Sequence, residues 1–332
     1  KGRFRGDLAR KKMAEVVRPP RTVAIAVPAA SSEHPGPTTA VEWALRNVLR
    51  SGDKVIFLHS ESVKDQYYFA ETIHSQHEYD KWAAYLEEQD RELKSSVAAL
   101  LAPAIEECEK LSIGHELLWV KGEARDAVVD TCEQKKADIL VIGNRGLGPV
   151  TRALLGSVSD YAMHHCHCAV AIIREHLQLM DDPGHRRRIA VAVEPHSNEY
   201  VVNWVTANVL RKGDHVLYLN VSHALKTQKR LNASQPADPS LQGHESKAYT
   251  EAAALLGALV EHCDHNEVTH EGVLLPGRPA EALEAACDNF KVDLLVMGSM
   301  GKGAVKRMIM GSVSTHCVHH VKCPVLVVRK PK

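Results

Sequence analysis

The sequence predicts an α/β protein made of two tandem domains, each an open, doubly wound sheet with helices on both faces. Its 332 residues are about right for two domains of common size. The two halves of the chain repeat the same motifs in the same order. Within each half, short continuous runs of Val, Ile and Leu alternate with amphipathic segments, as expected for parallel strands covered on both faces.

The duplication is visible in two pairs of segments. WALRNVLRSGDKVIFLHS (43–60) matches WVTANVLRKGDHVLYLNV (204–221) at an offset of 161 residues. GEARDAVVDTCEQKKADILVIG (122–143) matches GRPAEALEAACDNFKVDLLVMG (277–298) at an offset of 155 residues. The first half therefore carries six extra residues between the two matched segments, and the whole unit occurs twice.

Five strands are expected in each half, because five apolar runs recur in each copy. The first-half strands fall near 22–27, 54–59, 115–120, 138–142 and 169–174. The second-half strands fall near 188–193, 215–221, 270–275, 293–297 and 324–329. Amphipathic segments such as 41–50 and 83–108 predict helices between them. Right-handed crossovers then place helices on both faces of each parallel sheet.

The chain divides into four parts and one insertion. The first 21 residues hold eight Lys/Arg against two acidic residues and no apolar run, which indicates a disordered basic extension. The expected parts are this extension at 1–20, a first domain at 21–176, a linker at 177–187, a second domain at 188–332, and a mobile polar insertion at 226–246. Whether Met13 is the natural start stays open.

The composition excludes several classes of protein. Lys+Arg and Asp+Glu are both 41, so no global field attracts nucleic acid or anionic lipid. No apolar run reaches the length of a membrane span. Eight cysteines in a chain of this length predict buried free thiols in a reducing compartment, not a disulfide framework. We therefore expect a cytoplasmic protein, and the basic extension leaves a nuclear or organellar location open.

A glycine-rich segment follows the fourth predicted strand of each half. The segments are GNRGLGPVTRALLGSVS (143–159) and GSMGKGAVKRMIMGSVS (298–314), which share the spacing Gly, two residues, Gly, nine residues, Gly-Ser. Glycine allows close backbone approach, successive N–H groups form a nest for an anion, and a helix start adds unpaired N–H groups. The segments predict a phosphate site, with the Ser157 and Ser312 hydroxyls donating to phosphate or capping the helix. The alternative is that the glycines only form tight turns.

With this glycine spacing, and with the closing CPVLVV (323–328), the chain resembles the universal stress protein family over residues 20–331, as a tandem, plant-type member. The resemblance implies the sheet order 3-2-1-4-5 in each domain. It implies ATP or a related adenine nucleotide as the ligand, alone or with Mg²⁺. It also implies that the domains pair through their last strands, AVAIIR (169–174) and PVLVVR (324–329), as an intramolecular pseudo-dimer. Such pairing would protect two apolar sheet edges.

The resemblance also implies which residues contact the nucleotide. In the family an Asp ends the first strand and holds the nucleoside, and the matching residues are Pro28 and Glu194. Pro28 offers no acceptor side chain, whereas Glu194 keeps a carboxylate, so the second half is expected to be the better site. The expected ATP-binding residues of the second half are Gly298, Ser299, Gly301, Gly303, Gly311, Ser312, Val313, Glu194 and Val221. Those of the first half are Gly143, Asn144, Gly146, Gly148, Gly156, Ser157 and Val158.

Two tracts rich in His and Cys, HHCHC (164–168) and HCVHHVKC (316–323), resemble metal-binding tracts. His164 can share a helix face with His167 or Cys168, but tetrahedral coordination needs ligands that converge. We interpret both tracts as polar helix ends that carry a buried Cys, and we predict no metal site.

The sequence contains no HExxH, GxSxG or zinc-deaminase motif. We therefore predict an ATP-binding, stress-response regulatory protein whose conformation depends on the nucleotide, with no enzymatic activity beyond slow ATP hydrolysis. The alternative is an interaction or chaperone-like module that has lost nucleotide binding and works through dimerisation. An ATP-using enzyme such as an adenylyl transferase lacks a supporting motif. The protein partner, the stress and a homodimer of chains stay open.

Overall fold

The computed structural model describes residues 20–28, 39–61, 75–144, 155–174, 177, 184–194, 199–231, 242–262, 268–299 and 310–330. The basic extension at 1–19 and most of the expected linker lie outside these described residues. The first half contains β1 (Thr22–Ala26), α1 (Thr39–Asn47), β2 (Lys54–Glu61), α3 (Gln76–Lys110), β3 (Gly114–Lys121), α4 (Ala124–Gln134), β4 (Ile139–Gly143), α5 (Ser157–His165) and β5 (Ala169–Ile173).

The second half repeats this order of elements and adds one short strand, β8. It contains β6 (Arg188–Ala192), α6 (Glu199–Asn208), β7 (His215–Ser222), β8 (Lys229–Leu231), α7 (Gly243–His262), β9 (Thr269–Pro276), α8 (Pro279–Asn289), β10 (Leu294–Gly298), α9 (Ser312–His320) and β11 (Val325–Val328). Every strand expected from the sequence is present, within one or two residues at each end.

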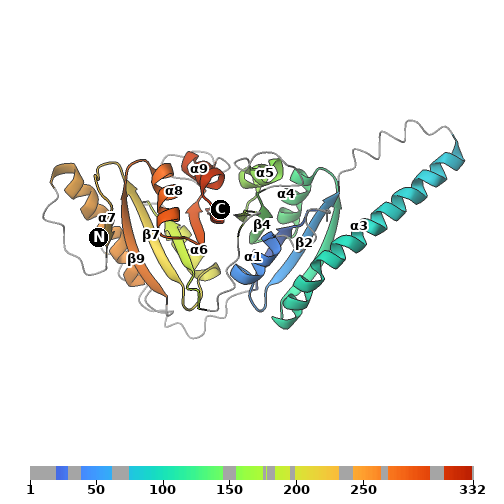
Figure 1. The fold of residues 1–332 in the computed structure, drawn as a ribbon, viewed down its shortest axis with the longest axis horizontal. Helices are drawn as coiled ribbons and strands as arrows, with labels where there is room; N and C mark the ends of the chain where they lie inside the picture. Colours follow the sequence, from blue (N-terminus) through green and yellow to red (C-terminus); the bar gives the residue numbers. More distant parts are fainter. Residues whose placement is uncertain are drawn as a thin grey trace.

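All strands of the described residues form one sheet, in the order β3-β2-β1-β4-β5-β11-β10-β6-β7-β9-β8 (Figure 1). Within the first half the neighbours are parallel in the order 3-2-1-4-5. The second half repeats that order from β11 to β9, again with parallel neighbours. The doubly wound fold predicted for both domains is therefore confirmed.

The segment after β7 differs from the expected mobile insertion at 226–246. Lys229–Leu231 adds an antiparallel edge strand to β9, and α7 already begins at Gly243. Arg230 holds this strand, since its guanidinium pairs with Glu271 at 3.2 Å and lies over the ring of Phe290 at 5.1 Å. The polar composition concealed this strand because an edge strand has one solvated side.

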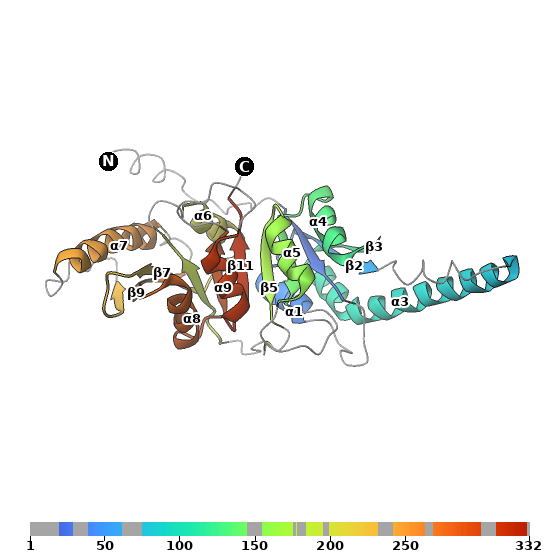
Figure 2. The same cartoon turned by 90° about the horizontal axis from the view of Figure 1, so that it is seen from above.

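The last strands of the two halves pair with each other. β5 and β11 are antiparallel, with Val170 opposite Val327 and Ile172 opposite Val325 (Figure 2). These apolar strands are buried, so neither half exposes the sheet edge formed by its last strand. The sheet therefore continues through the junction of the halves, as the expected pairing of last strands requires.

Each face of the sheet carries one core that extends across both halves. On β1, Ile25 packs into the core under α1, α3, α6 and α7, and Ala24 packs into the core under α4, α5, α8 and α9. The period of two along each strand produces this division. Only the second part of α3, from Val97 to Cys108, contributes buried residues, and its first part projects beyond the sheet (Figures 1 and 2).

Arginines connect the two halves at the ends of α1 and α6. Arg21 donates from Nη1 to the carbonyl of Asn208, the last residue of α6, at 2.7 Å. Arg187 makes the reciprocal contact, from Nη1 to the carbonyl of Asn47 at the end of α1, at 3.2 Å. Terminal carbonyls of a helix lack intrahelical donors and carry its negative dipole end, so guanidinium groups satisfy them well. The junction is thus polar at its margin and apolar along the strands.

The described helices include none with both the length and the apolar content needed to cross a bilayer.

His215, at the start of β7, predicts a pH dependence of stability. Its Nδ1 lies 2.7 Å from the Thr269 hydroxyl, and its Nε2 lies 3.6 Å from a carboxylate oxygen of Glu271. Burial lowers the pKa of His215, and the opposing effect of Glu271 does not cancel this. The unfolded chain therefore binds the proton more readily, so the contribution is present above about pH 6.5 and lost as pH falls below that value.

We expect His215→Gln to reduce the fall in the free energy of unfolding between pH 7.5 and pH 5.5, measured by urea denaturation at both pH values. The matched control is His244→Gln, because His244 is exposed at the start of α7. An unchanged pH slope in His215→Gln would contradict the prediction.

Candidate functional site

The glycine segments leave the carboxyl ends of two strands and lead to two helix starts. Gly143 ends β4 before α5, and Gly298 ends β10 before α9. Residues 145–154 and 300–309 lie outside the described residues. They include four of the expected ligand-binding glycines, Gly146, Gly148, Gly301 and Gly303. The structure thus describes the strand end and the helix start on either side of each glycine segment, which we call the frame of the segment.

In the first half, short hydrogen bonds join the loop ends to the sheet. The N–H of Gly156 donates to the carbonyl of Asn144 at 2.6 Å, and the N–H of Asn144 donates to Ile173 at 2.7 Å. The hydroxyl of Ser159 donates to the carbonyl of Gly143 at 2.6 Å. Strand end and helix start are therefore held side by side at the carboxyl edge, where doubly wound sheets bind ligands.

The second half has the same frame. The N–H of Gly311 donates to Ser299 at 2.9 Å, the N–H of Ser299 donates to Val328 at 3.0 Å, and the Ser314 hydroxyl donates to Gly298 at 2.9 Å. Sequence reasoning missed the structural roles of Ser159 and Ser314. The available signal was the second serine of GSVS, which is present in both copies.

The starts of α5 and α9 carry no side-chain cap. Gly156 and Gly311 are the N-cap residues, and neither helix start has a side-chain capping hydrogen bond. The expectation that Ser157 and Ser312 could cap these helices is therefore wrong, because both are already the first helical residue. Their side chains are exposed beside the N–H groups of the first turn. Such a helix end attracts an anion through its dipole and its unpaired donors. Val158 and Val313, which follow, are half-buried.

The expected nucleoside end lies where β1, β2, β6 and β7 finish. Pro28 and Glu194 both lie two residues beyond the first strand of their half, and Val221 is half-buried near the end of β7. The buried side chains of His59 and Asn220 point back to the strands, with His59 Nδ1 3.0 Å from the Val27 carbonyl and Asn220 Nδ2 2.8 Å from the Val193 carbonyl. These two side chains connect the end of the second strand of each half to the end of the first strand.

Tyr200, which sequence reasoning also missed, lies against Gly298. A Cβ atom at position 298 would lie 2.4 Å from the Tyr200 hydroxyl oxygen and 3.3 Å from Cγ2 of Val201. Burial raises the pKa of Tyr200, and the nearby carboxylate of Glu194 raises it further. Tyr200 therefore keeps its proton and is a hydrogen-bond donor at this edge. The glycine at 298 is required at least partly by this side chain.

Ser299, which directly follows Gly298 in the chain, has an unsatisfied polar atom. Its side chain is 1% exposed, and its hydroxyl has no hydrogen-bond partner among the described residues. A buried hydroxyl without a partner is unfavourable, so a hydrogen-bond partner outside the described residues is expected for it. The end of β10 thus has the Tyr200 hydroxyl against Gly298 and a buried hydroxyl at Ser299.

The two histidines that could share a helix face, His164 and His167, are placed differently. His164 Nδ1 lies 2.8 Å from the Asp160 carbonyl, and His167 is exposed. Among the described residues, the one group of three or more potential ligands with converging atoms consists of cysteines, Cys132, Cys166 and Cys168.

Comparison with known proteins decides the family. A model of the universal stress protein family matches residues 24–174 and 185–329. The chain belongs to the universal stress protein family. Over 253 residues this universal stress protein is 24% identical to one from Mycobacterium bovis, an alignment that covers 76% of this chain and 80% of that protein.

The fold also resembles that of a solved structure. The crystal structure of a universal stress protein from Archaeoglobus fulgidus has a TM-score of 0.56 at 18% identity, and covers 94% of this chain and 97% of that chain, which shows the shared fold. A family protein from Arabidopsis thaliana was solved with AMP bound. It is 22% identical, covers 47% of this chain and 93% of that chain, and has a TM-score of 0.33.

Proposed function

We propose that this universal stress protein is an ATP-binding regulatory protein of the stress response. The observation that carries the proposal is the pair of uncapped helix starts, each held beside the end of a central strand. The triphosphate would accept hydrogen bonds from the first N–H groups of α5 or α9 and from Ser157 or Ser312. Mg²⁺ would accompany the phosphates, and the adenine nucleoside would lie at the ends of the first and second strands.

We place the better site in the second half. Glu194 offers a carboxylate to a ribose hydroxyl, where Pro28 offers no acceptor in the first half. The Tyr200 hydroxyl lies against Gly298, and the Ser299 hydroxyl, which has no partner among the described residues, follows it in the chain, so both would be candidate donors. ATP occupancy would change the conformation of the protein and the surface that a partner meets, so the proposed function is a switch, with at most slow hydrolysis.

The second candidate is an interaction or chaperone-like module without a nucleotide. It is favoured by Tyr200, whose side chain already occupies the space in front of Gly298. The proposed compartment is the cytoplasm in either case. The support is that the described cysteines, Cys108, Cys132, Cys166, Cys168, Cys287, Cys317 and Cys323, are free thiols.

The test is calorimetric titration of ATP, with and without Mg²⁺, into the wild type and into Ser312→Asp and Ser157→Asp. An acidic residue in the first helical turn favours the helix dipole, so both variants should fold. The same carboxylate repels the phosphates, so we expect Ser312→Asp to weaken ATP binding at least tenfold. Adenosine binding should change little, because adenosine carries no charge.

The neutral control variants are Ser312→Asn and Ser157→Asn. A tenfold loss only in Ser157→Asp would move the site to the first half and keep the switch. No ATP binding by the wild type at millimolar concentration would refute the switch and support the interaction module.

A further inference from the structure

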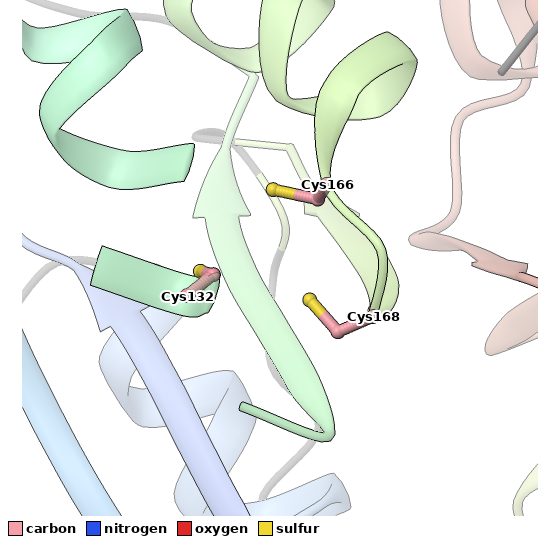
Figure 3. Close-up of side chains that lie close together, drawn as sticks. All are labelled: Cys132, Cys166 and Cys168. Carbon is pink, nitrogen blue, oxygen red and sulfur yellow. The ribbon is translucent and has the colours of Figure 1, made fainter. Parts of the chain in front are cut away.

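Three cysteine side chains of the first half converge away from the proposed nucleotide site. Cys132 lies in the last turn of α4, Cys166 follows the last residue of α5, and Cys168 directly precedes β5. Their sulfur atoms all lie within 4.8 Å of one another. Figure 3 shows Cys132 approaching from α4 and the other two from the connection between α5 and β5. Three soft ligands from two separate segments of the chain thus meet at one point.

The spacing of the sulfur atoms suits a single small cation. Around a tetrahedral zinc ion with Zn–S bonds of about 2.3 Å, neighbouring sulfurs lie about 3.8 Å apart. A group of three within 4.8 Å therefore needs shifts of an ångström or less to reach that geometry. Cys132 and Cys166 are 4% and 3% exposed, so a bound cation would be shielded from solvent on their side.

Two of the three cysteines line a cavity. The cavity has a volume of about 330 Å³, and Cys132 and Cys168 both line it. It lies at the junction of the halves, because Trp204 and Arg329 of the second half also line it. Water can therefore reach a cation on this side and fill a fourth coordination position, as in open zinc sites.

The charge of the surroundings also favours a divalent cation. Three thiolates around Zn²⁺ carry a net charge of −1, and the guanidinium of Arg329 interacts electrostatically with both Cys166 and Cys168. The same guanidinium donates to the carbonyl of Met163 in the last turn of α5. The second half therefore supplies the positive charge that a buried trithiolate site of the first half needs.

We propose that Cys132, Cys166 and Cys168 bind one Zn²⁺ ion as three thiolates, with the fourth coordination position facing the cavity at the junction. Binding deprotonates the three thiols, and the protons pass to solvent. The ion joins the end of α4 to the end of α5, the helix whose other end begins at Ser157 in the candidate nucleotide site. The site is separate from that nucleotide site, because it lies at the opposite end of α5.

The second half provides an internal comparison. Cys287 and Cys323 occupy the positions equivalent to Cys132 and Cys168, but Val321 stands where the first half has Cys166. The second half therefore lacks the third thiolate of the cluster. The proposal accordingly predicts one zinc site per chain, although the fold is repeated.

The experiment titrates the full chain, reduced and freed of metal, with Co²⁺ and then with Zn²⁺. We expect one equivalent of Co²⁺ to produce sulfur-to-cobalt charge-transfer absorption, which Zn²⁺ then abolishes. Cys166→Val copies the arrangement of the second half and should lose this absorption, with Zn²⁺ affinity falling at least 100-fold. Cys317→Ala is the matched control, because Cys317 is a buried thiol of α9 outside the cluster.

Circular dichroism establishes that Cys166→Val is folded, and Cys168→Ser serves as a second loss-of-ligand variant. The exposed histidines can also bind Co²⁺, but they do not give thiolate charge-transfer absorption. Co²⁺ binding without that absorption in the wild type would overturn the proposal. The same absorption at full strength in both Cys166→Val and Cys168→Ser would overturn it as well.

Discussion

Replacing Asp53 by Ala is expected to lower the free energy of unfolding by about 3–5 kcal/mol, because the change leaves a buried charge without its partner. The Asp53 side chain is 1% exposed, and its carboxylate pairs with Nη2 of Arg21 at 2.5 Å. It also accepts from the backbone N–H of Arg50 at 3.1 Å. Arg21 also donates to the end of α6 in the other half. The substitution is therefore expected to weaken the junction of the halves as well as the first domain.

The measurement is urea denaturation of the full chain, with Asp288→Ala as the control. Asp288 pairs with Lys322 at 2.6 Å, but the two side chains are 45% and 80% exposed. Such a surface pair contributes about 1 kcal/mol or less. The double variant Asp53→Ala/Arg21→Met should recover part of the lost stability, because it removes the unpaired charge. A fall in the free energy of unfolding of less than 1 kcal/mol in Asp53→Ala would contradict the prediction, because it would mean that Arg21 is not left as an unpaired buried charge.

Replacing Gly298 by Ala is expected to destabilise the protein by about 1–3 kcal/mol, through steric overlap with Tyr200. The added Cβ would lie 2.4 Å from the Tyr200 hydroxyl oxygen and 3.3 Å from the ring carbon Cζ. The backbone at Gly298 is not among the positive-φ glycines, so the cost arises from the contact and not from backbone strain. Tyr200→Phe removes the closest atom and should restore most of the stability in the double variant.

Gly257→Ala is the matched control, since Gly257 lies in α7 and an added Cβ there meets nothing within 4 Å. That substitution should stabilise the protein by about 0.5–1 kcal/mol. In the wild-type background, Tyr200→Phe is expected to weaken ATP binding two- to tenfold, the effect of one hydrogen bond. Tighter ATP binding by Tyr200→Phe would instead show that the hydroxyl obstructs the site.

Much of the fold was predictable because it depends on local patterns that the chain repeats. The apolar runs located the strands to within one or two residues, and the family resemblance supplied their order. The edge strand Lys229–Leu231 was missed because it pairs through its backbone and its side chains are polar. A pattern of apolar residues reveals strands that have a buried face. A short edge strand can form without such a face, so the pattern does not reveal it.

Part of the candidate site was also predictable from the sequence, and part was not. The glycine spacing located the strand end at Gly298 and the helix start at Ser312, which are close to each other in the chain. Tyr200 lies almost one hundred residues away in sequence and meets Gly298 only because α6, which follows β6, packs against the neighbouring strand β10. No periodicity along the chain encodes that contact.

The sequence by itself therefore determined the duplicated α/β architecture and the strand end and helix start on either side of each glycine segment. Both follow from local properties, namely the periodicity of apolar residues and the spacing of the glycines. Only the tertiary structure brought Arg21 to the end of α6, Tyr200 to Gly298, and Cys132 to Cys166 and Cys168. These contacts arise from strand order and from the antiparallel pairing of β5 with β11. Both depend on which apolar surfaces bury each other, and that is decided when the whole chain folds.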